Sequence, residues 1–407
     1  MAAYTIDSLT VKDRILLYLS RFSNIVPGQT FNVPYDVTQD GIAIAVGITR
    51  AHVSIDLKRL YETGMVTNWR AHQKGQRAKR LVYSITDGGK ARAEETAVKL
   101  RANGIDVDAI LRRPENTVDW AALGASDRDA FGKVCVMRIP VPAELFDKES
   151  VKSLRPDSSG RIFIPSEVAR RFLDRASPAE IGGWNSWAAD YWMQEGNPQE
   201  RLYHLVEAGR KAEAGRFACL RMNELLSNPN EDLLRSLNLI GSDYRYEDIL
   251  WMRSQVAYCC RNQEELRRCS RELGKLKSPR EFLTEGQLEM LRKDYRSAYG
   301  MAEKAYEFMH DPDSAVLMSR TKVRMGDLAE ADRLAAEACE AMRRLGEAGA
   351  IDEILKVRAE IAYRNGDPDS ACALLGKAEA AAPDYRRKDL HSLCEAVRDP
   401  DSAVVFD

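Results

Sequence analysis

Two clusters of basic and polar side chains near the start of this 407-residue chain have the chemistry to bind a polyanion. Guanidinium and ammonium groups neutralise phosphates, while hydroxyl, imidazole and guanidinium groups hydrogen-bond to base edges. The first cluster lies in TRAHVSIDLK and the second in WRAHQKGQRAKR. The candidate contact residues are Thr49, Arg50, His52, Ser54, Lys58, Arg70, His72, Lys74, Arg77, Lys79 and Arg80. Whether they act together depends on the elements that present them.

The stretch TQDGIAIAVG predicts a short helix just before the first cluster. Thr38 is suited to cap its start, because a threonine hydroxyl accepts a hydrogen bond from the first free amides of a helix. Gly47 is suited to end it, because glycine adopts the left-handed conformation at little cost. Between them, apolar residues recur at helical spacing, at Ile42, Ala45 and Val46.

A second predicted helix follows directly, with Thr49 as its cap and Gly64 at its end. Its apolar residues, Val53, Leu57 and Leu60, are spaced for one buried face. Two short helices joined at a glycine form a helix-turn-helix, whose second helix enters the major groove of DNA by its N-terminal turns. The first cluster therefore lies on the outward face of a candidate recognition helix.

The second cluster is predicted to lie on a β-hairpin. MVTNWRA and AKRLVYSIT alternate as strands do, and HQKGQR supplies a turn long enough to project. VKDRILLYLSRF predicts a helix before this unit, QTFNVP a small third strand, and SITDGGKARAEETAVKLRANG a closing helix. A helix-turn-helix followed by a basic hairpin is a winged helix, and cations on the hairpin would neutralise phosphates.

Residues 8–104 resemble the winged-helix domains of prokaryotic transcription regulators, with YSITDGGKARAE similar to their usual ending. The resemblance implies double-stranded DNA as a partner. Winged helices also serve as protein-docking modules, and His52 and His72 taken alone fit ordinary surface histidines better than base-reading ones. Ile55, which faces outward in this register, and Asp56, where many such helices are apolar, depart from the family pattern.

Charge is unevenly distributed along the chain. Residues 1–104 contain 15 Lys and Arg against 9 Asp and Glu, a net charge of +6, whereas the remaining 303 residues contain 45 against 53, a net charge of −8. The net positive charge of residues 1–104, here called the basic head, favours an anionic partner for this part of the chain, although many solvated surfaces are equally basic.

Residues 105–183 are predicted to form a linker or a small insert. ILRRPENTVDWAALGASDRDAFG has broken helical periodicity, and VCVMRIPVPAELF and SSGRIFIPSEVARRFLD mix strand-like runs with prolines. A segment this long is expected to pack partly on a neighbour. Trp184 and Trp187, just beyond it, could line a ligand pocket, but core tryptophans are the favoured interpretation.

Residues 184–407 show a repeat. The polar residues at its breaks are separated by 31, 34, 32, 33 and 40 residues, and they are Asn197, Asn228, Asn262, Asp294, Asp327 and Asp367. A period near 34 with a helix on each side of the break is typical of tetratricopeptide repeats. About six such units would stack into a right-handed α-solenoid with a concave groove for a peptide or protein. The fold is thus predicted to be mainly α, a winged helix followed by a tetratricopeptide-like solenoid.

No enzymatic motif is present in the sequence. It contains no GxxxxGK[ST], GxSxG or HExxH, and its eight cysteines form no CxxC. The order of winged helix, RIPVPAELF and WAADYWMQEGNPQERLYHLVEAGR resembles archaeal and bacterial signal-transduction NTPases with tetratricopeptide sensors. About forty residues separate the last two landmarks, too few for a nucleotide-binding sheet. We therefore expect no catalytic residues, metal or cofactor.

The N-terminal residues lack a basic lead followed by an apolar stretch, and no run reaches the ~18 apolar residues of a membrane span. A cytoplasmic protein without a membrane partner is expected. The combined prediction is a DNA-binding transcriptional regulator with a sensor or dimerisation domain, acting as a homodimer. The alternatives are a non-enzymatic scaffold whose winged helix docks on protein and a peptide-responsive, quorum-type regulator.

Overall fold

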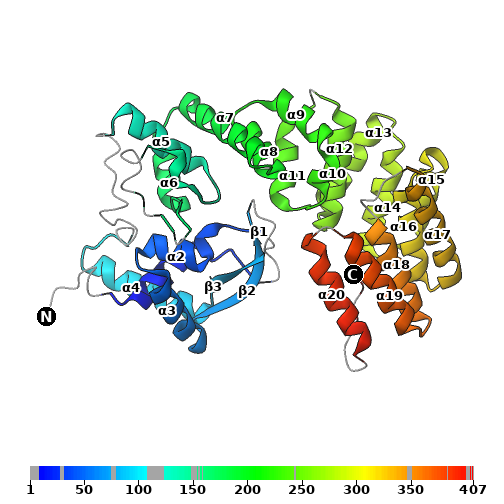
Figure 1. Cartoon of the computed structure of the whole chain (residues 1–407), viewed down its shortest axis with the longest axis horizontal. Coiled ribbons are helices and arrows are strands. Elements are labelled where there is room, and N and C mark those ends of the chain that lie inside the picture. The colour runs from blue at the N-terminus through cyan, green and yellow to red at the C-terminus, as the bar shows by residue number, and fades with distance from the viewer. Residues whose placement is uncertain are drawn as a thin grey trace. The chain divides into compact units, whose positions relative to one another are not determined.

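The computed structural model describes residues 9–27, 32–74, 79–107, 123–147, 154, 156–157, 159–242, 244–345, 351–382, 384–399, 404 and 406. The chain divides into two compact units, Met1–Arg210 and Lys211–Asp407. The fold is mainly α, with a small sheet near the N-terminus and stacked helices in the second unit (Figure 1). In the described ranges, no helix has both the length and the apolar character needed to cross a membrane.

The first unit begins with a three-stranded sheet and four helices. Strand β1 pairs parallel to β2, and β2 pairs antiparallel to β3, so β2 is central. The elements are α1 (Val11–Leu19), β1 (Asn32–Val33), the 3-10 turn η3 (Tyr35–Val37), α2 (Gln39–Val46), α3 (Arg50–Glu62), β2 (Val66–Gln73), β3 (Lys79–Ile85) and α4 (Asp87–Ala102). These confirm the predicted order of helices, small strand and hairpin.

The corner between α2 and α3 forms as its sequence predicts. The Thr38 hydroxyl accepts from the Gly41 amide at 3.1 Å, and the Thr49 hydroxyl accepts from the His52 amide at 3.4 Å. Gly47 has φ 67°, the left-handed conformation that ends α2. The apolar faces of both helices then meet in one core, which buries Ile42, Ala45, Val46, Val53, Leu57 and Leu60.

The described residues between 123 and 207 form a packed subdomain with its own core rather than an open linker. It contains α5 (Ala125–Val136), β4 (Val141–Pro142), β5 (Arg161–Ile162), α6 (Ser166–Leu173), α7 (Pro178–Gln194) and α8 (Pro198–Glu207). Gly132 lets α5 approach α7, because a Cβ at this position would lie 2.2 Å from the Trp184 ring. Trp184 is buried and stacks on Phe172 at 5.5 Å, so its core interpretation is confirmed.

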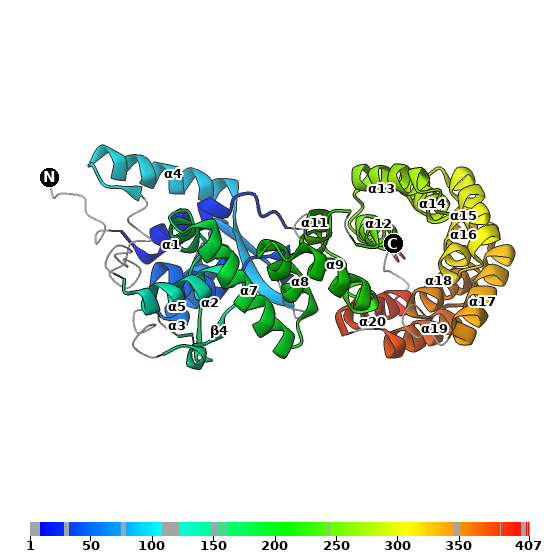
Figure 2. The same cartoon turned by 90° about the horizontal axis from the view of Figure 1, so that it is seen from above.

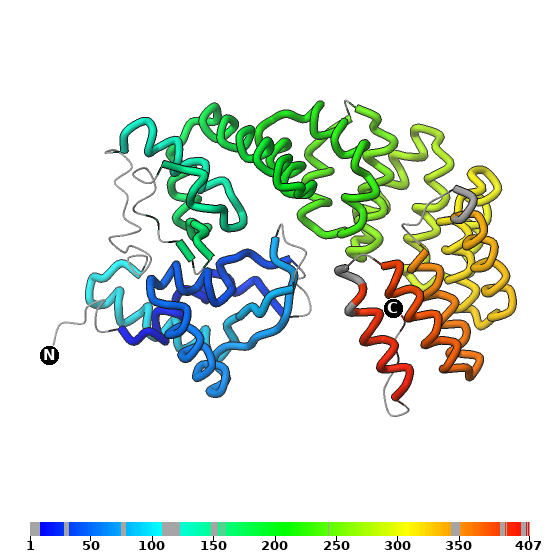
Figure 3. Tube along the Cα trace, in the orientation of Figure 1, coloured from blue at the N-terminus to red at the C-terminus, as the bar shows by residue number. Residues whose placement is uncertain are grey.

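The second unit is a stack of helices. They are α9 (Lys211–Leu220), α10 (Met222–Leu226), α11 (Glu231–Ile240), α12 (Tyr246–Cys259), α13 (Gln263–Lys275), α14 (Arg280–Arg292), α15 (Tyr295–Met309), α16 (Pro312–Met325), α17 (Leu328–Leu345), α18 (Ile351–Arg364), α19 (Pro368–Ala381) and α20 (Asp384–Arg398). Consecutive pairs from α12 to α19 are helical hairpins that follow a curve (Figure 2). The trace runs up and down along this curve, as in an α-solenoid (Figure 3).

The predicted repeat breaks coincide with helix caps, with one correction. The side chains of Asn262, Asp294 and Asp367 accept from the amides three residues later, at 3.0, 3.1 and 2.9 Å. Asn228 lies in the break between α10 and α11, but the residue that caps α11 is Asn230, whose side chain accepts from the Leu233 amide at 2.9 Å. A cap must immediately precede the first helical residue, which here is Glu231.

The start of the repeat array also differs from the prediction. The predicted boundary between residues 183 and 184 falls inside α7, and the helices on both sides of Asn197, α7 and α8, belong to the first unit. The reason is that α7 packs on α5 and α6 through Trp184, Ala188 and Tyr191. The consecutive helical hairpins from α12 to α19 correspond to the later repeat units, and the earlier helices α9 to α11 are shorter and less regular.

Candidate nucleic-acid interface

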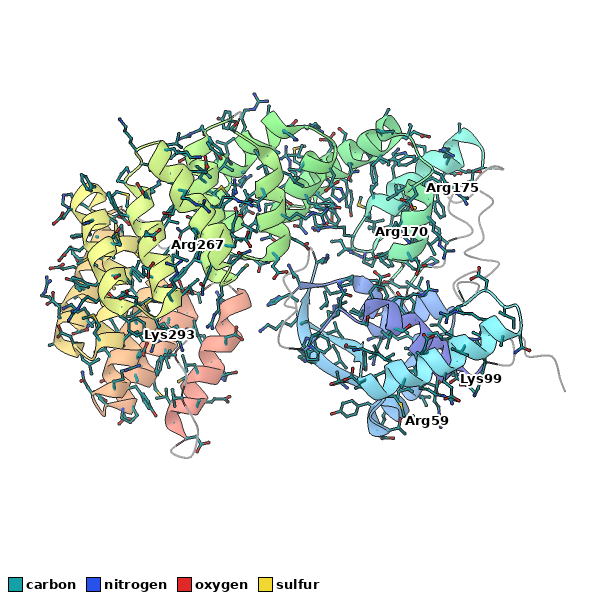
Figure 4. The ribbon with its side chains drawn as sticks, turned by 180° about the vertical axis from the view of Figure 1, so that it is seen from behind. Arg59, Lys99, Arg170, Arg175, Arg267 and Lys293 are labelled. Atoms are coloured by element: carbon teal, nitrogen blue, oxygen red, sulfur yellow. The ribbon has the colours of Figure 1, made fainter. Side chains whose placement is uncertain are left out.

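Helix α3 presents the first polar cluster to solvent. Since Val53, Leu57 and Leu60 point into the core, the opposite face is exposed, and it carries Thr49, Arg50, His52, Ser54 and Lys58. Arg59, which the sequence analysis did not single out, is also exposed on this helix (Figure 4). The signal for Arg59 was its position beside Lys58 on the outward face.

The N-terminus of α3 is ordered by its own cap. The Thr49 hydroxyl lies 3.0 Å from Nδ1 of His52 and also accepts from the His52 amide. The remaining amides of the first turn have no partner within the helix and, with the helix dipole, favour an anion such as phosphate. Arg50 adds a formal positive charge at the same end.

The register of the hairpin separates its exposed arginines. Arg70 lies opposite Leu81, and Arg80 lies opposite Ala71. Residues directly opposite each other share a face, and successive residues alternate between faces, so Arg70 and Arg80 project from opposite faces of the hairpin. A single duplex beside the hairpin would contact one of these faces.

The remaining hairpin candidates are less exposed. His72 and Lys79 lie opposite each other and, like Lys74, are half-buried. Arg77 lies outside the described residues. Among the described cations of the hairpin, Arg70 and Arg80 are the exposed ones.

Arg80 and Arg50 lie near the same carboxylate, Asp40 of α2. Nε of Arg50 is 3.5 Å from Oδ1 of Asp40. Burial is the largest influence on Asp40 and raises its pKa. Arg50 and Arg80 lower this pKa and Asp157 raises it, so all three charged groups act on the Asp40 carboxyl. The pairing of Thr38 with Val82 places the start of α2 beside the hairpin, close to Arg80, and the Arg50–Asp40 pair joins the start of α3 to the start of α2. Sequence spacing did not reveal this proximity.

Two ion pairs made by cations of the outer face of α3 are long. Lys58 lies 4.0 Å from Glu62, and Arg59 lies 3.8 Å from Asp56. Both side chains of the Lys58–Glu62 pair are exposed, and such pairs contribute about 0.2–1 kcal/mol, so a phosphate can displace Glu62 from Lys58. Ile55 of the same helix is 52% exposed and adds an apolar contact surface.

A buried carboxylate anchors this region to the following subdomain. Asp36 accepts from the amide and hydroxyl of Ser166 at 2.9 and 2.6 Å, and from the Tyr18 hydroxyl at 3.0 Å. Pro165 precedes α6 and gives it no side-chain cap, so Asp36 supplies the cap. Arg21 and Glu167 form an ion pair beside it. Burial raises the pKa of Asp36, and the hydrogen bonds from Ser166 and Tyr18 oppose this shift.

No group of three or more His, Cys, Asp or Glu side chains within the described ranges could hold a metal ion. The nearby ionisable groups are thus arranged as caps, ion pairs and exposed cations. Such an arrangement can bind an anion and position it.

Comparison with known proteins assigns no family. No family model matches the chain, and no curated protein matches its sequence. A signal transduction ATPase with numerous domains and a tetratricopeptide repeat sensor, from Pyrococcus horikoshii, aligns with TM-score 0.32 and 13% identity over 78% of this chain and 61% of that chain. Yeast Tom70 aligns with TM-score 0.33 and 11% identity over 94% of this chain and 69% of that chain. This chain spans less than two thirds of the Pyrococcus protein, and at these scores neither likeness carries a function over to it.

Proposed function

We propose that this chain is a DNA-binding transcriptional regulator, with a winged helix that docks on double-stranded DNA and a helical-repeat unit that binds a peptide or protein or pairs two copies. The observation that carries the proposal is the surface shared by the start of α3 and the hairpin, where Arg50 and Arg80 both lie near Asp40. Helix α3 then enters the major groove with its N-terminal residues toward base edges.

Regulation would follow from a shift between two states of the second unit. A ligand that prefers one curvature of the helical stack changes the population of that state, and in a homodimer this changes the separation of the two recognition helices. Operator affinity that stays constant with every ligand bound to the stack would contradict this mechanism.

The direct test is a titration of the purified chain against labelled duplex DNA, including its own upstream region, at several salt concentrations. Arg50→Ala/Arg80→Ala removes two cations of the proposed surface. The matched control is Lys99→Ala/Arg101→Ala, which removes two exposed cations of α4 (Lys99 in Figure 4). We expect tight, salt-dependent binding that the control retains.

In the Arg50→Ala/Arg80→Ala variant, affinity should fall, and the slope of log affinity against log salt should decrease by about 2, because each lost phosphate contact contributes about 0.9. Equal losses of affinity in Arg50→Ala/Arg80→Ala and in Lys99→Ala/Arg101→Ala would show that DNA binding is non-specific charge attraction. No binding at low salt would overturn the proposal.

A protein-docking role is the second candidate, and the exposed apolar residues of α3 favour it. Ile55 and Tyr61 are each 52% exposed on this helix. Isolated exposed apolar residues are common, but on a candidate recognition helix they suit a protein partner as well as a thymine methyl. The same titration discriminates, since docking on protein alone predicts no duplex binding and no effect of Arg50→Ala/Arg80→Ala on function.

A further inference from the structure

The helical hairpins of the second unit line a cavity of about 380 Å³ that is strongly basic. Its walls come mainly from α12, α14, α16 and α18, the first helix of each consecutive hairpin, and from the turns that follow α12 and α14. Its described lining residues include five cations and one carboxylate, which are Arg261, Lys293, Arg320, Arg324, Lys356 and Glu360. Residues 105–407 have a net charge of −8, so this cluster of cations runs against the overall charge of that part of the chain.

Two of the arginines are held in place by ion pairs between α16 and α18. Arg320 of α16 pairs with Glu353 of α18. Nη1 of Arg324 lies 2.7 Å from Oε1 of Glu360, and Nη2 of Arg364 lies 2.8 Å from the same oxygen. Because two arginines share the Glu360 carboxylate, these pairs position the guanidinium groups without cancelling their combined charge.

Arg261 and Lys293 add positive charge that no described carboxylate neutralises. Neither forms an ion pair with a described residue, and both are exposed (Lys293 in Figure 4). Each stands directly before the residue that caps the next helix, with φ 55° and 66°, the left-handed conformation that glycine adopts more readily. The same position of the next two hairpins is occupied by Gly326 and Gly366. A long cation thus stands beside the cavity at the two positions where the backbone favours glycine.

Helix dipoles account for only part of this cluster. A cation at the C-terminal end of a helix is stabilised by the dipole, which applies to Arg261, Lys293 and Arg324. Lys356, in contrast, lies in the N-terminal half of α18, and Arg320 precedes the last turn of α16, so the dipole does not stabilise either charge. The convergence of all five cations on one cavity therefore indicates an anionic ligand.

The size and lining of the cavity indicate a small organic phosphate. A volume of about 380 Å³ lies at the lower end of the range for small-molecule sites, about 300–1,000 Å³. One phosphate group carries a charge of about −1.5 to −2 and three acceptor oxygens, which arginine forks bind in pairs. Rings and apolar side chains beside the cations can contact an organic part of the ligand, and they belong to Tyr258, Tyr295, Met290 and Val357.

We propose that this cavity is a binding site for a phosphorylated small molecule whose organic part is a ring system, as in a nucleoside phosphate. The proposal goes beyond the proposed function, because it gives the helical-repeat unit a small ligand in addition to a peptide or protein. It does not depend on DNA binding.

The test is isothermal titration calorimetry of the full chain with four probes, ADP, adenosine, pyrophosphate and hexa-aspartate, without divalent cations. ADP should bind saturably, and its affinity should fall as salt is added. Adenosine, which lacks the charge, should bind at least about a hundredfold more weakly, since each lost contact to a charged group costs about tenfold or more. Pyrophosphate, which lacks the organic part, should bind at least about tenfold more weakly than ADP.

Arg261→Gln/Lys293→Gln should reduce the affinity for ADP by at least about tenfold, because it removes the two cations without a described ion-pair partner. Glutamine keeps a long polar side chain at both turns. The matched control is Arg271→Gln/Lys277→Gln, which removes two exposed cations of the same unit that do not line the cavity. Lys277 also has a left-handed backbone, with φ 55°. This control should bind ADP like the unsubstituted chain, and all three proteins should have the same melting temperature without ligand.

Absence of saturable ADP binding, or equal losses of affinity in the two double variants, would overturn the site. Tighter binding of hexa-aspartate than of ADP would overturn the phosphate and indicate an acidic peptide, and equal binding of pyrophosphate and ADP would overturn the organic part. Duplex titration of the same proteins keeps the two proposals separate. ADP binding without DNA binding contradicts the regulator alone, and DNA binding without ADP binding contradicts this site alone.

Discussion

Asp36 shows how a single buried residue can hold the candidate interface in place. Its carboxylate caps α6 and accepts from Tyr18 of α1, so one side chain joins α1 and η3 to the following subdomain. Replacing it by alanine leaves the Ser166 amide without this acceptor. We expect Asp36→Ala to lower the free energy of unfolding of the first unit by about 1–3 kcal/mol, the usual effect of an unsatisfied buried group.

Asp36→Asn separates shape from charge. Asparagine keeps an oxygen for the Ser166 amide and a donor for its hydroxyl, but does not ionise. Because burial raises the pKa of Asp36 above 3.8 in the folded chain, the folded state binds the proton more tightly than the unfolded state, and wild-type stability falls as pH rises from about 3.8 through the folded pKa. The stability of Asp36→Asn relative to wild type should therefore increase between about pH 4 and about pH 7.

Urea unfolding at the two pH values, followed by tryptophan fluorescence, measures this difference for wild type, Asp36→Asn and Asp36→Ala. Asp36→Ala shares the loss of charge and provides the control for the lost cap. A difference between Asp36→Asn and wild type that does not change with pH would show that ionisation of Asp36 does not oppose folding.

At the scale of elements, the turns of the helical hairpins can be tested by exchanging glycine and non-glycine residues at their left-handed positions. Gly326→Ala places a Cβ at φ 85° and should lower the free energy of unfolding by about 1 kcal/mol, the cost of the left-handed conformation. Arg261→Gly/Lys293→Gly removes the strain of the left-handed conformation at these two residues and should raise the free energy of unfolding. The gain is reduced by the conformational entropy that glycine adds to the unfolded chain. Thermal unfolding of both variants tests the pair. A loss of stability in Arg261→Gly/Lys293→Gly would show that these cations support the turns through contacts that outweigh the strain.

The elements that the sequence predicted well are those set by nearby residues. Thr38 and Thr49 bond to amides three residues away, so capping chemistry alone locates both helix starts. Asn228 and Asn230 flank a proline, and both residue types can cap, so the local signal could not choose between them. The core after residue 123 depends on Gly132 and Trp184, which no periodic pattern connects.

The candidate site shows the same division between local and long-range information. Exposure of Arg50 and Lys58 follows from the helical register of the buried residues on α3. The opposite orientations of Arg70 and Arg80 require the strand register, and the approach of Arg80 to Asp40 requires the tertiary structure. Asp36 and Ser166 are 130 residues apart, so their hydrogen bonds had no sequence signal.

For the whole molecule, the contrast between a basic head and an acidic remainder affects how the chain would meet DNA. Residues 1–104 have a net charge of +6 and the rest −8. A duplex attracts the head and repels the other residues at low salt, and added salt screens both effects. If the chain binds DNA as proposed, this charge distribution would orient it on the duplex as well as attract it.

One recognition helix reads few base pairs, so the proposed regulator is expected to act as a homodimer on two half-sites. Half-sites one helical turn apart, about 10–10.5 bp between centres, place both helices on the same side of the duplex. Binding of the second copy is then intramolecular and raises affinity by about 10²–10⁴. Sedimentation equilibrium should give twice the mass of one chain, without and with DNA.

Spacing of the half-sites tests this geometry directly once an operator is found. Inserting about 5 bp between half-sites rotates one of them to the opposite side of the duplex and should reduce affinity to that of a single half-site, whereas inserting about 10 bp should restore part of it. A duplex with one half-site is the control and sets the lower limit. An affinity that does not depend on spacing, together with the mass of a single chain, would instead mean that one copy binds DNA alone. The helical stack would then bind its ligand without pairing two copies.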